Sequence, residues 1–221
     1  VFAMSSAPDA PADSVVTGRA PAVATRKRPK PGERRVQILQ VLAEMLQQPG
    51  PERVTTAALA ARLAVSEAAL YRHFASKAQM CEALIDCIES SVFGLINQIG
   101  EREPAGRARA ARIVAMVLQF GEKNPGMARV MVGDALVFEH QRLQQRMNQF
   151  FDKLDAALRQ SLRDGALADA AEPATLTPDA DARVRASVLT AFVAGRLQRF
   201  ARSGFRRAPS EQLGACIARM L

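Results

Sequence analysis

The chain has 221 residues, of which 48% are apolar and 24% charged, and its formal net charge is +8. This length suits one large domain or two small ones, and the composition is that of a globular protein. No apolar run approaches the ~18 residues of a membrane-spanning helix, the first residues lack the apolar core of a signal peptide, and three cysteines fit no disulfide framework. We therefore expect a cytoplasmic protein that does not associate with membranes.

Positive charge is concentrated near the N-terminus. Residues 1–78 carry eleven Lys and Arg against six Asp and Glu, so about a third of the chain holds most of the positive excess. This bias suits a polyanionic partner, either nucleic acid or an anionic membrane surface. A basic surface that only aids solubility is the simpler alternative.

The first 31 residues are rich in Ala, Pro and Ser and end in the basic string RKRPKP. They hold almost no large apolar side chains, so burial cannot offset the entropy lost on ordering. We predict a disordered arm over 1–31 whose basic end lies just before the first helix.

From Gly32 onward, apolar residues recur at spacings of three and four, which predicts an all-α protein without strands. The expected helices cover 33–48, 56–63, 67–74, 76–99, 107–123, a short stretch after Asn124-Pro125-Gly126, 139–163, 179–203 and 210–220. The acidic residues 164–182 are interpreted as a loop. We divide the chain into a DNA-binding domain over 32–78 and a helical domain over 79–221.

Residues 55–74, TTAALAARLAVSEAALYRHF, have the spacing of a DNA-reading helix-turn-helix motif. Leu59 and Leu63 of the first short helix can meet Leu70 of the second. Ser66 can cap the second helix, and Thr55 or Thr56 the first.

The outward face of the second helix carries the residue types that contact DNA. Ser66 and Ala68 are short enough for close approach, and Arg72 can bind guanine or a phosphate. Tyr71 and His73 are candidate phosphate donors, although either can also serve as a core residue. Lys77 begins the next helix, where the backbone amides and the helix dipole also favour phosphate.

The string LYRHFASKAQM, after TTAALAARLAVSEAA, resembles the DNA-binding domain of TetR-type regulators. Residues 121–164 and the string RFARSGFRRAPS resemble the nucleoid occlusion factors of this family. The resemblance implies a three-helix DNA-binding domain on a helical dimerisation domain, and a nucleoid-associated homodimer that binds pseudo-palindromic double-stranded DNA. It also implies a partner, the tubulin-like cell-division GTPase, whose assembly the DNA-bound protein antagonises.

The resemblance assigns residues to both partners. The implied DNA contacts are Thr55, Thr56, Ser66, Ala68, Tyr71, Arg72, His73 and Lys77, and the implied partner surface includes Cys87, Met116, Glu122, Lys123 and Asn124. One departure is Ala64, which stands where the helix-turn-helix usually has Gly. A left-handed backbone there would cost Ala about 1 kcal/mol.

The long helices over 139–163 and 179–203 are the expected dimer interface, as a four-helix bundle formed with a second copy. A strip of small residues on the second of them permits close approach: Ser187, Ala191, Ala194 and Gly195.

Other functions have weaker support. The two histidines fall on different predicted elements, the cysteines lack metal-ligand spacing, and no Gly-rich phosphate loop is present, so we expect no catalytic residues, cofactor or metal. A ligand-responsive TetR-type transcriptional repressor is the main alternative, with a cavity lined by Phe93, Met116, Phe120, Met131, Phe138 and Phe150, although we favour the simpler expectation that these side chains fill the core. A helical adaptor protein with incidental DNA binding is a further alternative.

Overall fold

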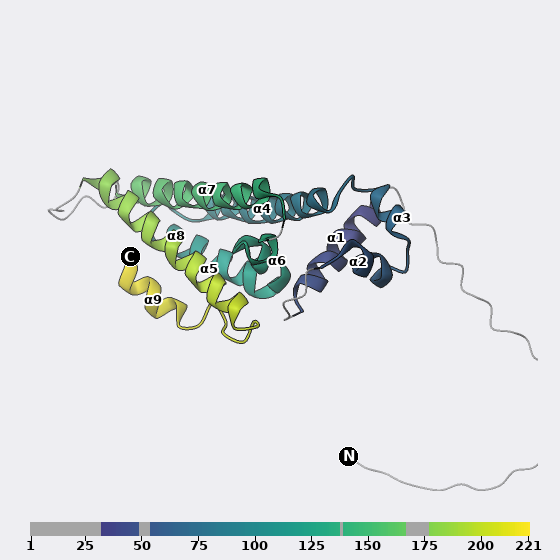
Figure 1. Ribbon diagram of the computed structural model, residues 1–221. Helices are drawn as coiled ribbons and strands as arrows, with labels where there is room; N and C mark the ends of the chain where they lie inside the picture. The colour runs from purple at the N-terminus through teal and green to yellow at the C-terminus, as the bar shows by residue number, and fades with distance from the viewer. Residues whose placement is uncertain (1–31, 49–53, 138, 167–176) are drawn as a thin grey trace, which may run out of the picture.

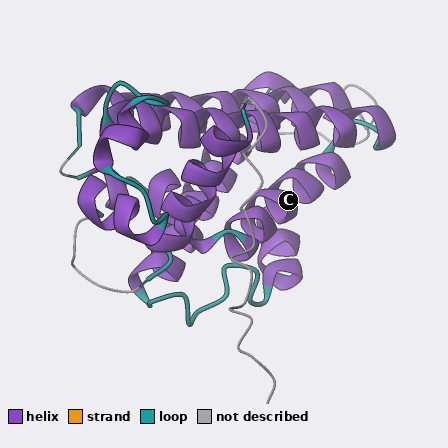
Figure 2. Ribbon diagram, turned by 90° about the vertical axis from the view of Figure 1, so that its right-hand side faces the viewer, coloured by secondary structure: helices purple, strands orange, loops and turns teal. Residues whose placement is uncertain are grey.

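The computed structural model describes residues 32–48, 54–137, 139–166 and 177–221, and within these ranges it contains helices and no strands (Figures 1 and 2). The elements are α1 (Glu33–Leu46), α2 (Thr56–Arg62), α3 (Glu67–Tyr71), α4 (Lys77–Arg102), α5 (Arg107–Lys123), α6 (Pro125–Met131), the short 3₁₀ helix η1 (Asp134–Leu136), α7 (Gln141–Ala166), α8 (Pro178–Arg202) and α9 (Leu213–Met220). The predicted all-α class is confirmed. The expected arm over 1–31 lies outside the described residues.

The first three helices form a small unit at one end of the molecule (Figure 1). Its centre is built from residues that are at most 2% exposed: Ile38, Leu42, Leu59, Leu70 and Phe74. The helix that follows, α4, runs from this unit along the whole larger part of the molecule. The division that we expected between residues 78 and 79 falls in the first turn of α4, so one continuous helix joins the two parts.

The larger part is built around α7 and α8, which pack against each other along their length, with α4 and α5 alongside. The buried positions on α7 step by three and four residues: Leu143, Met147, Phe150, Leu154, Leu158 and Leu162. This is the apolar stripe that the sequence predicts, and it confirms the helical period over this segment.

The loop expected over 164–182 is shorter, because both long helices extend into that range. The hydroxyl of Thr177 accepts a hydrogen bond from the amide of Ala180 at 3.3 Å, and Pro178 opens α8. Asp179 and Asp181 lie in the first turn, where carboxylates are favoured by the helix dipole. The part of this acidity that Asp179 and Asp181 supply therefore belongs to a helix start.

At the other end of this segment, Gly165 does not stop α7. A Cβ built on Gly165 would lie 2.1 Å from the Cα of Gly106, so the glycine allows the start of α5 to pack directly on α7. The amide of Gly106 also donates to the carbonyl of Ser161 at 2.7 Å. Close backbone packing therefore explains why α7 contains Gly165, although glycine is unfavourable inside a helix.

Other helix boundaries also differ from expectation, since α1 ends at Leu46 rather than 48, α4 ends at Arg102 rather than 99, and α7 begins at Gln141 rather than 139. The helix α3 ends at Tyr71 rather than 74, because the chain turns there to bury Phe74. The last helix, α9, begins at Leu213 rather than 210, since Gln212 adopts a left-handed conformation with φ 51°.

Candidate nucleic-acid interface

The turn between α2 and α3 has the capped geometry that the sequence predicts. The hydroxyl of Thr55 accepts from the amide of Ala58 at 3.1 Å, and that of Ser66 accepts from the amide of Ala69 at 3.3 Å. Ala64 lies between the helices with φ 52°, in the left-handed region. The two caps and the left-handed alanine are thereby confirmed as structural features.

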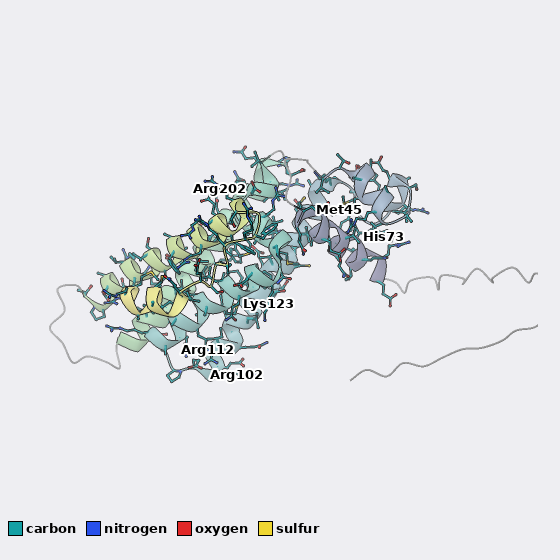
Figure 3. The ribbon with its side chains drawn as sticks, turned by 90° about the horizontal axis from the view of Figure 1, so that it is seen from below. Met45, His73, Arg102, Arg112, Lys123 and Arg202 are labelled. Atoms are coloured by element: carbon teal, nitrogen blue, oxygen red, sulfur yellow. The ribbon has the colours of Figure 1, made fainter. Side chains whose placement is uncertain are left out.

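The outer face of α3 is exposed to solvent. The side chains of Ala68, Arg72 and His73 are exposed, and Tyr71 retains 45% of its accessible surface. The Tyr71 hydroxyl makes no hydrogen bond with any of the described residues, so its polar group remains available for an external acceptor. Figure 3 shows His73 on the open side of the small unit. This helix therefore presents the predicted residues together, and Tyr71 is not a core residue.

Both ends of α3 are tied to neighbouring helices. At its start, the hydroxyl of Thr56 donates to Glu67 Oε2 at 2.6 Å. Just after its end, Arg35 of α1 donates to the carbonyl of His73 at 2.7 Å and lies 4.0 Å over the ring of Phe74. These contacts fix the orientation of the exposed helix against α1 and α2.

The structure adds two arginines that the sequence analysis did not select, Arg34 and Arg35. Arg34 lines a hollow of about 180 Å³ between α1 and α3 together with the predicted Arg72, and Arg35 stacks on Phe74 nearby. They lie near one another through tertiary packing, although Arg72 is far along the chain from the other two. In the sequence, the adjacent arginines Arg34 and Arg35 at the start of α1 were the sign that could have pointed to this basic cluster.

Lys77 is placed differently from the other candidate DNA contacts. Its ammonium group lies 2.5 Å from a carboxylate oxygen of Glu139, just before α7, and only 19% of its side chain is exposed. A phosphate that contacts Lys77 therefore has to compete with this carboxylate for the ammonium group.

The residues expected to bind the protein partner fall into two groups, those on the face of a surface groove and those held in local contacts. A groove of about 400 Å³ lies between α4 and α5, lined by Leu95, Gln98, Ile99, Arg102, Glu103, Arg112, Ala115, Met116 and Gln119. We call it the α4–α5 groove. In Figure 3, Arg102 and Arg112 lie together at one edge of the molecule, and Lys123 lies further toward the small unit. Met116 is thus a groove residue.

Two further predicted partner residues share this face. Eleven residues separate Cys87 from Gln98, and seven separate Met116 from Lys123, so each pair lies on one side of its helix. Cys87 and Lys123 are both exposed. Burial of the thiol, and secondarily the negative charge of Asp86, raise the pKa of Cys87 above its usual range.

Glu122 and Asn124 instead hold the local structure. Glu122 accepts a hydrogen bond from the Ser210 hydroxyl at 2.5 Å, which ties α5 to the segment before α9. The amide of the Asn124 side chain donates to the carbonyl of Phe120 at 2.8 Å and closes the end of α5. These contacts give both residues an intramolecular role, and neither of them lines the groove.

Aromatic rings pack against one another where the alternative hypothesis placed a small-ligand cavity. Phe150 is completely buried, with its ring centre 5.4 Å from that of Phe93 and 5.3 Å from that of Phe151. Met131 is also buried, and Phe138 lies outside the described residues. Phe93 and Phe150 therefore fill the core.

The outer face of α8 carries exposed apolar side chains. Val184 and Val188 keep 53% and 47% of their surface, and Ser187, Ala191 and Gly195 lie on the same exposed side. Ala194 is partly covered. Within the part of the chain that is described, no helix combines the length and apolar character needed to cross a bilayer.

The helix-turn-helix unit followed by a helical domain defines a class, the TetR-type DNA-binding regulators, and comparisons with known proteins agree. Residues 38–84 match the bacterial regulatory proteins of the tetR family, and residues 106–218 match the tetracyclin repressor-like C-terminal domain of SlmA-like type. Among solved structures, the regulator MbdR from Azoarcus superposes with a TM-score of 0.66 at 15% identity, over 84% of this chain and 96% of that one. FadR from Bacillus subtilis, solved with stearoyl-CoA, superposes with a TM-score of 0.64 at 14% identity, over 84% and 96% of the two chains.

Curated relatives define the family more closely. The nucleoid occlusion factor SlmA of Cronobacter sakazakii is 47% identical over 183 residues, which is 82% of this chain and 90% of that protein. SlmA of Idiomarina loihiensis is 43% identical over 182 residues, with the same coverage. The chain belongs to the SlmA family of nucleoid occlusion factors. It is accordingly a DNA-binding regulator rather than an enzyme.

Proposed function

We propose that this protein is a nucleoid occlusion factor that binds specific double-stranded DNA as a homodimer and, when bound, antagonises assembly of the tubulin-like cell-division GTPase over the chromosome. The observation that carries the DNA-binding part is the exposed outer face of α3, held in place at both ends. The identity to the SlmA proteins supports the division part.

Different parts of the helix-turn-helix have different tasks in this proposal. Tyr71, Arg72 and His73 offer exposed donors to phosphates and bases, and Ala68 allows close approach. Thr55 and Ser66 bind through the ends of α2 and α3 that they cap, while Thr56 steadies Glu67. Two copies of α3 would enter successive major grooves about 34 Å apart.

The Tyr71 hydroxyl gives the cleanest test of DNA binding, because no described residue uses it. Substituting Tyr71→Phe removes one polar atom and leaves the packing of the ring unchanged. We expect affinity for a duplex enriched from a random pool by the native chain to fall several-fold, with unchanged melting temperature and oligomeric state. Equal affinity of the variant and native chains at physiological salt would contradict the role of Tyr71.

The proposed partner surface is the α4–α5 groove with its neighbours Cys87, Met116 and Lys123. The groove offers an apolar floor, including Leu95, which is 37% exposed, between the cationic side chains of Arg102 and Arg112. Such a surface suits an extended segment with apolar and acidic side chains. Arg112 also pairs with Glu103 across the groove end, so its guanidinium is held in place.

Charge reversal at Lys123 tests this surface, since the side chain is exposed on α5 and makes no ion pair with any described residue. We expect Lys123→Glu to weaken the inhibition of GTPase polymers in sedimentation assays with DNA present, while DNA affinity is unchanged. Arg219→Glu, an exposed reversal on α9 at a residue that also makes no ion pair with any described residue, serves as the matched control. A loss of both activities in the Lys123 variant would indicate damage to the fold and contradict the assignment.

The exposed face of α8 is the proposed dimer interface. Val184 and Val188 form an apolar patch beside Gly195, where a Cβ would meet no atom within 4 Å in the single chain. A second copy packed against this face would form a four-helix bundle from α7 and α8 of each chain.

A further inference from the structure

Lys77 and Glu139 form an ion pair at the junction between the two parts of the molecule. Their charged atoms are 2.5 Å apart, with 19% of the lysine side chain and 7% of the glutamate side chain exposed. Lys77 is the first residue of α4, directly after the helix-turn-helix, whereas Glu139 lies just before α7. The pair therefore joins a candidate DNA contact to the start of a proposed dimer helix.

This pair is the first of a series between α4 and α7, which run side by side in the same direction (Figure 1). The next pairs are Glu82 with Arg142 at 2.7 Å, and Asp86 and Glu89 with Arg146 at 2.8 and 2.6 Å. In all of these, α4 supplies the carboxylate and α7 the cation.

The order of charges is reversed in the first pair, where the cation lies on α4 and the carboxylate lies before α7. The reversal places a lysine at the end of α4 nearest the exposed face of α3. There the free amides of the helix N-terminus also favour an anion. The carboxylate of Glu139 offsets the positive charge of the ammonium group and repels any phosphate brought beside it, so the two anions compete electrostatically for Lys77.

We propose that Glu139 competes with a DNA phosphate for Lys77, so that the carboxylate lowers DNA affinity and DNA binding releases the start of α4 from the start of α7. A phosphate contact by Lys77 draws the ammonium group away from an ion pair between partly buried groups. By linkage, DNA binding must weaken the pair to the same extent that the pair weakens DNA binding. DNA binding thereby changes the contact between α4, which carries part of the proposed partner surface, and α7, which belongs to the proposed dimer bundle.

This inference rests on the proposed DNA-binding function. It is testable because it predicts that removing the Glu139 carboxylate raises DNA affinity rather than lowering it. Substituting Glu139→Gln keeps the side-chain shape and removes the competing charge. We expect the variant to bind a labelled duplex, enriched by the native chain from a random pool, about threefold to tenfold more tightly, as befits the release of a partly screened pair. A carboxylate that only supported the fold would produce weaker binding on removal.

A double-variant cycle separates competition from a general change in charge. The gain must disappear when Glu139→Gln is combined with Lys77→Gln, because the released lysine is then absent. Glu82→Gln, which removes an equal charge one turn further along α4, should leave affinity near the native value. A gain that persists without Lys77, or an equal gain in the Glu82 variant, would overturn the proposal.

A second measurement covers the case in which Glu139→Gln fails to fold. In the otherwise native chain, Lys77→Gln should reduce the slope of log affinity against log salt by about one, the value for one lost phosphate contact. An unchanged slope would overturn the inference. Failure of the native chain to enrich any duplex would instead defeat the proposed function itself, so the two failures are distinguishable.

Discussion

Gly126 of α6 lies directly against the backbone of Ala43 in α1: a Cβ built on Gly126 would stand 2.0 Å from the carbonyl oxygen of Ala43. Beside this contact, Arg129 of α6 donates to the carbonyls of Leu46 and Gln48 at 3.4 Å each. The DNA-binding helices are therefore attached to the larger part of the molecule through backbone contact as well as through the continuous α4.

Gly126→Ala should separate α1 from α6, because a backbone oxygen cannot yield to the added methyl as a flexible side chain could. We expect a loss of about 1–3 kcal/mol in unfolding free energy, typical of overpacking, measured by thermal denaturation followed by circular dichroism. Gly94→Ala in α4 is the control, since nothing lies within 4 Å of its Cβ position. It should gain roughly 0.5–1 kcal/mol from helix propensity. Equal stability of the two variants would refute the close contact.

Ala64→Gly should stabilise the protein, because φ 52° is strained for alanine and ordinary for glycine. The expected gain is about 1 kcal/mol, or roughly 2–4 °C in melting temperature for a protein of this size. Ala61→Gly within α2 should have the opposite sign, since there the glycine only loses helix propensity. Destabilisation by the Ala64 change would show that the left-handed turn is not retained in solution.

The Cys87 thiol should react slowly with alkylating agents near neutral pH, since burial and then the charge of Asp86 raise its pKa. The reactive species is the thiolate, whose fraction at a given pH falls as the pKa rises. Asp86→Asn should lower the pKa and shift the pH profile of iodoacetamide labelling toward lower pH. Mass spectrometry of Cys87 peptides, with Cys216 in the same digest as an internal reference, provides the measurement. An unmoved profile would show that Asp86 does not act on the thiol.

Val188→Arg should dissociate the proposed homodimer, because it places a charge in the apolar face of α8. Sedimentation equilibrium is expected to show a shift toward the monomer mass, together with weaker binding to a two-half-site duplex. Leu95→Arg, an equally bulky change in the exposed α4–α5 groove, should leave the dimer intact. Dissociation by both variants, or by neither, would place the interface elsewhere.

Local signals in the sequence predicted most of the helices and the capped helix-turn-helix. The spacing of Leu143, Met147 and Phe150 by three and four residues predicted the helix α7. Thr55 and Ser66 predicted where α2 and α3 begin, because their hydroxyls can cap a helix. The end of the predicted loop over 164–182 was placed wrongly because Asp179 and Asp181 are as common in a loop as in the first turn of a helix. Gly165 lies within α7, where its role is close packing against Gly106.

Contacts between distant segments could not be predicted in this way. Lys77 meets Glu139 across 62 residues, and Arg35 reaches the carbonyl of His73 across 38. Both depend on how whole helices are placed against one another, which periodicity does not reveal. The same holds for the α4–α5 groove, whose residues come from two helices that approach each other only in the folded chain.

The helix α1 is gripped at both ends by different parts of the protein. Arg35 near its start holds the end of α3, and Arg129 holds the carbonyls at its finish. Its 14 residues form a rod of about 20 Å, so any rotation about its contact with α6 would move its other end through a larger distance. A tilt of only about 5° at that contact would displace the far end by about 2 Å, for a rod of that length. In the proposed homodimer, small rotations within the larger part would thus change the distance between the two α3 helices. That distance has to match the fixed pitch of the DNA duplex, so such rotations would change DNA affinity.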